Sequence, residues 1–199
     1  MITKYQKEQT ATKLKKIYST YAQAINRANI DYGDISSWDL TGYTTEERTE
    51  KFAEKYLFPY VQVIKKCIPT SNECWSDTVY SPNGNIDNQF TNLLQTHTSA
   101  VLNDGSCIYL WAGGDSSHVW LITDINCQRK PNKIGRDIFN FLLRFEDTET
   151  TKSGYKPVGL HDIPMLTRDE IKENCSTTGV YCAALIAIDG WQIKDDYPW

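Results

Sequence analysis

A stripe of apolar side chains near the start of the chain sets the strongest constraint on its fold. Apolar residues recur every three or four positions from Leu14 to Ala28, the spacing that lines one side of an α-helix. Residues 5–13 are good helix formers but have almost nothing to bury. We therefore expect a long helix whose second part packs on the body of the protein, while its first part projects or continues a preceding segment.

More helix is expected after this first one. Thr44 or Thr45 can cap a second helix with acidic residues in its first turn, and the helical spacing of apolar residues continues as far as Ile64. Pro59 should end or kink this helix. A third, shorter helix is expected over residues 87–95.

The central part of the chain changes to a strand pattern. Three segments rich in β-branched and aromatic residues, separated by turn signals, predict an antiparallel meander: 100–111, 117–126 and 136–145. Asn103 to Gly105 can form a further tight turn inside the first segment. A hairpin turn over "AGGDSS" would place Trp111 opposite His118. The later residues look irregular, and residues 181–188 are either helix or strand.

This order of elements predicts an α+β fold in which the long N-terminal helix packs on an antiparallel β-sheet, with extra helices between the two. The length suits a single domain, residues 1–199. Its expected parts are the helix (1–30), a helical insertion (44–98), the meander (99–146) and a disulfide-bonded C-terminal region (147–199).

Six cysteines indicate an oxidising compartment, because an even number that brackets turn-forming residues is typical of disulfides. Two pairs are close in sequence and the third follows by elimination: Cys67 with Cys74, Cys175 with Cys182, and Cys107 with Cys127. With Cys107 opposite Ile122, the loop after Asn126 must fold back over the sheet to complete the third pair. A zinc site is the alternative, although short C-x-x-C spacings are missing.

Charge and hydropathy exclude two classes of partner. The net charge is -4, which argues against a nucleic-acid surface because such binding draws on a concentrated excess of Lys and Arg. No apolar run in these residues approaches the ~20 needed to cross a bilayer.

No catalytic arrangement can be assembled from the sequence. His97, His118 and His161 are the candidate bases, but a cysteine nucleophile needs a free thiolate, and bridging of all six cysteines closes that route. Common hydrolase, metalloprotease and nucleotide-binding motifs are missing from the sequence. We therefore expect that the protein is not an enzyme.

Several stretches taken together resemble the bacterial type IV pilins and the pseudopilins of type II secretion. The resemblance spans nearly the whole chain, and "DINCQRKPNKIGRDIF" and "DGWQIKDDYPW" are its most specific parts. It implies a structural filament subunit whose partners are other copies or related subunits, located in the periplasm or at the cell surface. It also implies a preceding apolar half of the helix that anchors the precursor in the inner membrane, so that these residues would be the remaining soluble part. The cleavage motif of the family and its glutamate are not among these residues, and Cys127 stands where relatives commonly carry Gly.

The resemblance also draws attention to one loop, because some relatives hold calcium in this region. Oxygen ligands gather at Asp124, Asn126 and Asp137, which makes them weak candidates for Ca²⁺. Lys130 and Lys133 would oppose a cation, and the full calcium-binding spacing is missing. The favoured interpretation is that Asp124 and Asn126 cap a turn through hydrogen bonds to the main chain, without a cofactor.

Aromatic residues supply the alternative function. Six Trp and twelve Tyr are many for this length, and three aromatic residues crowd the C-terminus: Trp191, Tyr197 and Trp199. Core packing explains most of them, and we expect it for Trp120 and Trp191. A secreted, disulfide-bonded binding module that recognises a glycan or a protein through loops and exposed aromatics is the alternative to a filament subunit.

Overall fold

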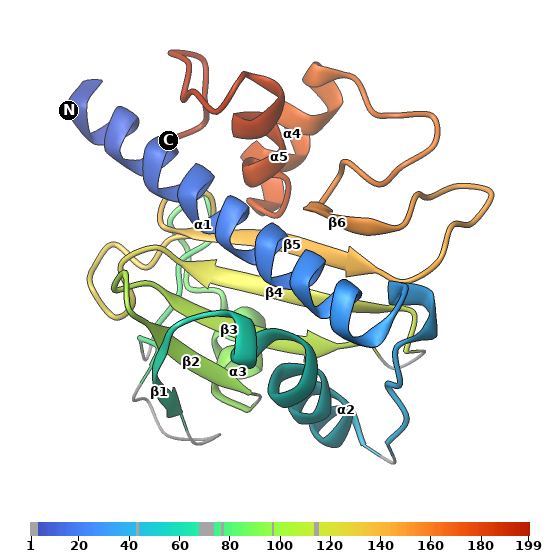
Figure 1. Ribbon diagram of the computed structural model, residues 1–199. Coiled ribbons are helices and arrows are strands. Elements are labelled where there is room, and N and C mark those ends of the chain that lie inside the picture. The colour runs from blue at the N-terminus through green and yellow to red at the C-terminus, as the bar shows by residue number, and fades with distance from the viewer. Residues whose placement is uncertain (1–3, 43, 68–73, 77, 97, 114–115) are drawn as a thin grey trace.

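The computed structural model describes residues 4–42, 44–67, 74–76, 78–96, 98–113 and 116–199 (Figure 1). It has the expected α+β fold: a long N-terminal helix, α1, lies across an antiparallel sheet whose six strands follow one another in chain order. The strands are β1 (Val63–Cys67), β2 (Ser99–Leu102), β3 (Cys107–Ala112), β4 (His118–Asp124), β5 (Ile138–Arg144) and β6 (Gly154–Pro157). The α-helices are α1 (Lys4–Tyr32), α2 (Thr45–Phe52), α3 (Asn88–Thr96), α4 (Arg168–Thr178) and α5 (Cys182–Ile188).

The apolar stripe of α1 packs as predicted. Leu14, Ile17, Tyr21, Ile25 and Ala28 are all buried, and burial begins one turn earlier than expected, at Ala11. The helix ends where Gly33 adopts a positive φ of 85°. Most side chains before Ala11 are exposed, and Figure 1 shows this blue end of α1 extending beyond the strands.

The region after α1 is only partly helical. Thr44 caps α2 as expected, by accepting a hydrogen bond from the main-chain N–H of Glu47. The helix then loosens into a π turn and a 3₁₀ turn that contains Pro59, so the predicted disruption at this proline is confirmed. The prediction of helix as far as Ile64 is wrong, because Ile64 lies in β1 with its side chain 69% exposed. The expected helical insertion therefore contains an edge strand of the sheet.

The predicted hairpin is present, but in a different register. Trp111 pairs with Trp120 and not with His118, and Cys107 pairs with Asp124. β3 also extends one residue further toward the turn than expected, to Ala112, which pairs with Val119. The turn predicted at Asn103 to Gly105 separates β2 from β3, with Gly105 donating a hydrogen bond to the Leu102 carbonyl at 3.0 Å.

The two faces of the sheet carry separate apolar clusters. On the front face, which we define as the face covered by α1, side chains such as Leu110, Leu121 and Phe141 pack with the helix stripe and with α5. On the back face, Tyr109, Ile122 and other side chains form a second, smaller cluster. The central strands are therefore buried on both sides.

The C-terminal region is more regular than expected. It contains β6, α4 and α5, so the ambiguous residues after Tyr181 form a helix. The Cys175–Cys182 disulfide joins α4 to α5. Thr167 and Glu170 form a capping box at the start of α4, in which each side chain bonds the other residue's main-chain N–H. Gly179 ends the helix with a positive φ of 76°.

Replacing Thr167 with alanine should lower the free energy of unfolding by about 1 kcal/mol, because α4 loses a side-chain cap. Urea denaturation followed by circular dichroism measures this loss. Thr167→Ser, which keeps the hydroxyl, is the control and should retain most of the parent's stability. Equal stability of the alanine variant and the parent would show that the cap contributes nothing.

Candidate functional site

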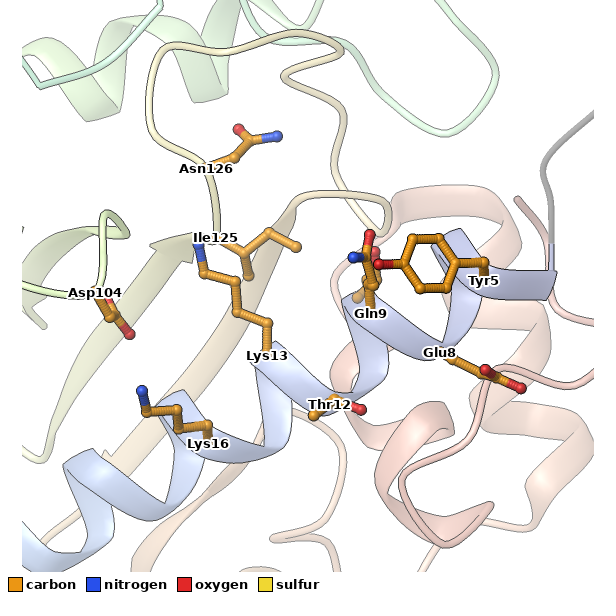
Figure 2. A pocket seen from close by; sticks show the side chains of 10 residues that line it. Tyr5, Glu8, Gln9, Thr12, Lys13, Lys16, Asp104, Ile125 and Asn126 are labelled. Atoms are coloured by element: carbon orange, nitrogen blue, oxygen red, sulfur yellow. The ribbon is translucent and has the colours of Figure 1, made fainter.

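A groove of 680 Å³ lies between the N-terminal part of α1 and the loops at one end of the sheet (Figure 2). The helix contributes Tyr5, Gln9 and Lys13 among others, and the turn between β2 and β3 contributes Asp104. The loop that follows β4 contributes Asn126. Figure 2 shows Lys13 directed from α1 toward this loop.

Side chains of both charges line this groove. Lys13 and Lys16 supply positive charge from α1, while Glu8 and Asp104 supply negative charge. The exposed start of α1 also contacts the C-terminal segment, where the Lys7 Nζ lies 3.1 Å from a carboxylate oxygen of Asp195. Charges of both signs therefore lie close together on this surface.

The loop that follows β4 is folded around two buried carboxyl groups. Asp137 accepts hydrogen bonds from the main-chain N–H groups of Asn132, at 2.8 Å, and Lys133, at 2.6 Å. Asp124 accepts one from the main-chain N–H of Asn126 at 2.9 Å. The structure therefore brings Asp124, Asn126 and Asp137 together. Asp124 caps a turn as predicted, but the second cap comes from Asp137 and not from Asn126, whose side-chain amide donates a hydrogen bond to Asp137 Oδ2 at 3.4 Å.

Burial strongly affects the protonation of both carboxyl groups. It raises the pKa of Asp124 from 3.8 to about 8, and the nearby negative charge of Asp137 adds to this effect. Burial likewise raises the pKa of Asp137. The folded chain therefore holds protons at this loop that the unfolded chain releases.

This difference predicts that the free energy of unfolding falls as the pH rises from about 4 to about 8. Below this window Asp124 is protonated in both states, whereas within it the unfolded state loses the proton first and gains stability. Above it the folded state carries the full cost of a buried charge. In the Asp124→Asn variant, the free energy of unfolding should fall less across this pH range than in the parent, by about 2 kcal/mol or more. Urea denaturation at several pH values measures both curves.

An exposed acid is the control for this pH series. Glu149→Gln removes a carboxyl group from an exposed position in the loop between β5 and β6, and should leave the pH dependence of the parent unchanged. If Asp124→Asn showed the same pH dependence as the parent, the pKa of Asp124 would not be raised by burial.

Two observations bear on whether the loop could hold a metal ion. Ca²⁺ takes six to eight oxygen ligands, but both oxygens of Asp137 and one of Asp124 already accept main-chain hydrogen bonds. Within the part of the chain that the structure describes, Asp124 Oδ2 is buried without a partner, and no three or more His, Cys, Asp or Glu residues form a group suited to a metal. Main-chain hydrogen bonds therefore account for three of the four carboxyl oxygens of Asp124 and Asp137.

A disulfide and the C-terminal residues hold the same loop in place. Cys107 and Cys127 are joined with their Cα atoms 5.0 Å apart, so the loop does fold back to β3. The Tyr197 hydroxyl donates a hydrogen bond to the Gly135 carbonyl, and the Arg136 guanidinium lies 5.4 Å from the Trp199 ring centre. The groove thus borders a well-anchored loop.

The aromatic residues at the C-terminus pack on the front of the sheet. Trp191 contacts Tyr18 of α1, with ring centres 5.0 Å apart, which agrees with the packing role expected for it. Tyr197 is buried, and Trp199 is partly buried against the same cluster. These residues connect the C-terminal segment to the helix.

The cysteines and histidines considered for catalysis have contacts of their own in the described part of the chain. All six cysteines are bridged, the third disulfide being Cys67–Cys74. The buried His161 ring lies between the carbonyls of Lys152 and Leu142, at 2.8 and 3.2 Å. The His118 Nδ1 lies 2.9 Å from the Ser117 Oγ, and His97 is outside the described residues.

Sequence reasoning did not identify the groove itself. No motif in the sequence marks Tyr5, Gln9, Lys13 and Lys16 as the lining of a groove, and Asp104 stands out only as a turn residue. The available signal was the polar side of the first helix, because a long helix with one apolar stripe presents its other side to solvent or to a partner.

Comparison with known proteins identifies the family of this chain. A family described as "Family of unknown function (DUF6613)" matches residues 1–199. No curated protein and no solved structure matches the chain.

Proposed function

The chain belongs to this family of unknown function, and we propose that it is the folded domain of a pilin-like or pseudopilin-like filament subunit. The observation that carries the proposal is the uneven burial of α1. Its apolar stripe from Ala11 to Ala28 is buried against the front of the sheet, while Tyr5 is 65% exposed. A helix that packs on the sheet through its later turns is suited to act as a stem that continues away from the domain.

The dimensions of α1 support this role. A helix of 29 residues is about 44 Å long, and the strands it crosses have only four to seven residues. Its first turns therefore contribute little to the core of this domain. They are available to pack against the corresponding helices of neighbouring copies.

The groove beside the stem supports contact between subunits. Lys13 and Lys16 lie on one element and Asp104 on another, so a neighbouring copy can offer opposite charges to each. Partners in this proposal are other copies or related subunits, and the domain performs no chemistry.

The disulfides agree with the location that this role requires. Three disulfides indicate an oxidising extracellular or periplasmic environment. No helix in the described part of the chain combines the length and the apolar character of a membrane span. In the proposal, an apolar extension of α1 anchors the precursor in the inner membrane before the subunit enters the filament.

Site-specific crosslinking in the producing cells tests the assembly. A photo-crosslinking amino acid at the exposed Glu8 should give a ladder of crosslinked subunits, while the same probe at Glu149, on an exposed loop, serves as the matched control. Sequencing the gene upstream of the Tyr5 codon should show about 20 apolar residues in frame. Monomer alone at Glu8, together with an ordinary cleavable signal upstream, would contradict the proposal.

A second candidate function is a secreted binding module. It is favoured by a pocket on the back of the sheet, where Trp111 and Trp120 lie beside the buried Asn140. The two functions differ in the face that they use, because the stem and its groove involve the front and one end of the sheet.

A further inference from the structure

A pocket of 480 Å³ lies on the back of the sheet and has the size of a small-molecule site. Trp111, Trp120 and Ile122 come from the adjacent strands β3 and β4. Phe90 of α3 and residues at the end of α4 also line it. The pocket is thus formed by elements that are far apart in sequence.

The buried side chain of Asn140 is the most unusual feature of this pocket. It is only 1% exposed, and neither its Nδ2 nor its Oδ1 has a hydrogen-bond partner among the described residues. Asn140 pairs with Ile122 across the sheet, so both side chains are on the back face. A buried amide without partners costs stability, and such groups in native proteins require an explanation.

The two tryptophans provide an aromatic surface next to this amide. Their ring centres are 6.3 Å apart, with the ring planes inclined by 36°. Both side chains are half-buried, and the Trp120 Nε1 is also buried without a partner in the described part of the chain. The pocket therefore combines apolar ring surfaces with an amide and an indole N–H that lack partners.

The charge of the lining restricts the ligand further. Asp87 is a carboxylate at the pocket, and none of the described lining residues is Lys or Arg. An anionic ligand would find no positive partner there. A ligand that suits the pocket therefore carries no negative charge, has an apolar face, and has groups that both donate and accept hydrogen bonds.

We propose that this pocket binds a neutral carbohydrate, with the C–H face of a sugar ring against Trp111 and Trp120 and a hydroxyl group at Asn140. A sugar hydroxyl both donates and accepts, so it can satisfy an amide that lacks both partners. The inference goes beyond the filament proposal and does not depend on it, because the pocket is on the face of the sheet opposite α1.

The test is titration of the intact domain with four neutral disaccharides: maltose, cellobiose, lactose and N,N′-diacetylchitobiose. Tryptophan fluorescence reports occupancy, and the NMR signals of the indole N–H and Asn amide groups report where the sugar binds. At least one disaccharide should give a saturable change that includes Trp120 and Asn140. Asn140→Leu and Trp111→Ala should each weaken this binding about tenfold or more.

The variants distinguish binding from a structural role. Asn140→Leu should be at least as stable as the parent, since the amide has no partner to lose. Trp111→Ala changes a half-buried position and provides an independent test, while Trp199→Phe, outside the pocket, should bind like the parent. The proposal is overturned if no disaccharide gives a saturable change or if both pocket variants bind like the parent. Binding of a capped alanine-serine tetrapeptide in place of sugars would also overturn it.

Discussion

Replacing Ile17 with aspartate is expected to unfold the domain at neutral pH. Ile17 is in the middle of the α1 stripe and only 1% exposed, within the cluster that joins the helix to the front of the sheet. The substitution removes an apolar side chain and places an unpaired charge in its position. The expected loss is about 4 kcal/mol or more, a large part of the stability of a typical domain. Far-UV circular dichroism and urea denaturation measure it.

The same helix offers a matched control. Ile30 is 83% exposed, so Ile30→Asp makes the same chemical change without burying a charge. A negative charge near the end of a helix is mildly unfavourable, and the loss should stay below about 1 kcal/mol. If the Ile17→Asp variant unfolded at the same urea concentration as the parent, Ile17 could not be buried between α1 and the sheet.

The first helix could be predicted because its burial is one-sided. Solvent covers the side opposite the stripe, so the sequence alternates between apolar and polar residues with the period of a helix. The central strands do not have this property. Both faces of β3, β4 and β5 are covered, so nearly every residue in them is apolar and the pattern contains little information on register. This is why Trp111 could be paired with His118 instead of Trp120.

Two elements, β1 and α4, give no clear apolar pattern in the sequence because few of their side chains are buried. β1 is an edge strand, and its residues Ile64, Lys65 and Lys66 are exposed. They do not alternate between apolar and polar as a half-buried strand does, so the sequence alone favours a continuation of the preceding helix. α4 buries only Ile171 and Cys175, four residues apart. Its ends were nonetheless visible in the sequence, because Thr167 precedes Glu170 by three positions and Gly179 follows the last turn.

The loop after β4 was predictable in its chemistry but not in its surroundings. Asp124 and Asp137 cap turns because short carboxylates bond nearby main-chain N–H groups, which is a local effect. The groove and the back-face pocket depend on contacts between distant segments. Asn140 did leave a signal, a single amide within the apolar stretch "DIFNFLLRF", but only the assembled sheet shows that the amide lacks partners.

Removing the Cys107–Cys127 disulfide is expected to lower the free energy of unfolding by about 3 kcal/mol. The two cysteines are 20 residues apart, so the bridge restricts a large part of the unfolded chain. The bridge also ties β3 to the loop that carries Asn126, beside the groove of Figure 2. The double variant Cys107→Ala, Cys127→Ala leaves no unpaired thiol, and urea denaturation without reductant measures the loss.

The Cys67–Cys74 pair provides the comparison, because its cysteines are only seven residues apart. The matching double alanine variant should lose about 2 kcal/mol, since closing a shorter loop removes less entropy from the unfolded chain. The difference of about 1 kcal/mol between the two variants tests the loop-length argument with the same atoms deleted in each. Equal losses, or a larger loss for the short loop, would mean that packing in the folded state and not chain entropy determines the contribution of these bridges. In the variant that lacks Cys107 and Cys127, added reductant can break only the Cys67–Cys74 and Cys175–Cys182 disulfides. Any further loss in the free energy of unfolding must therefore come from these two bridges.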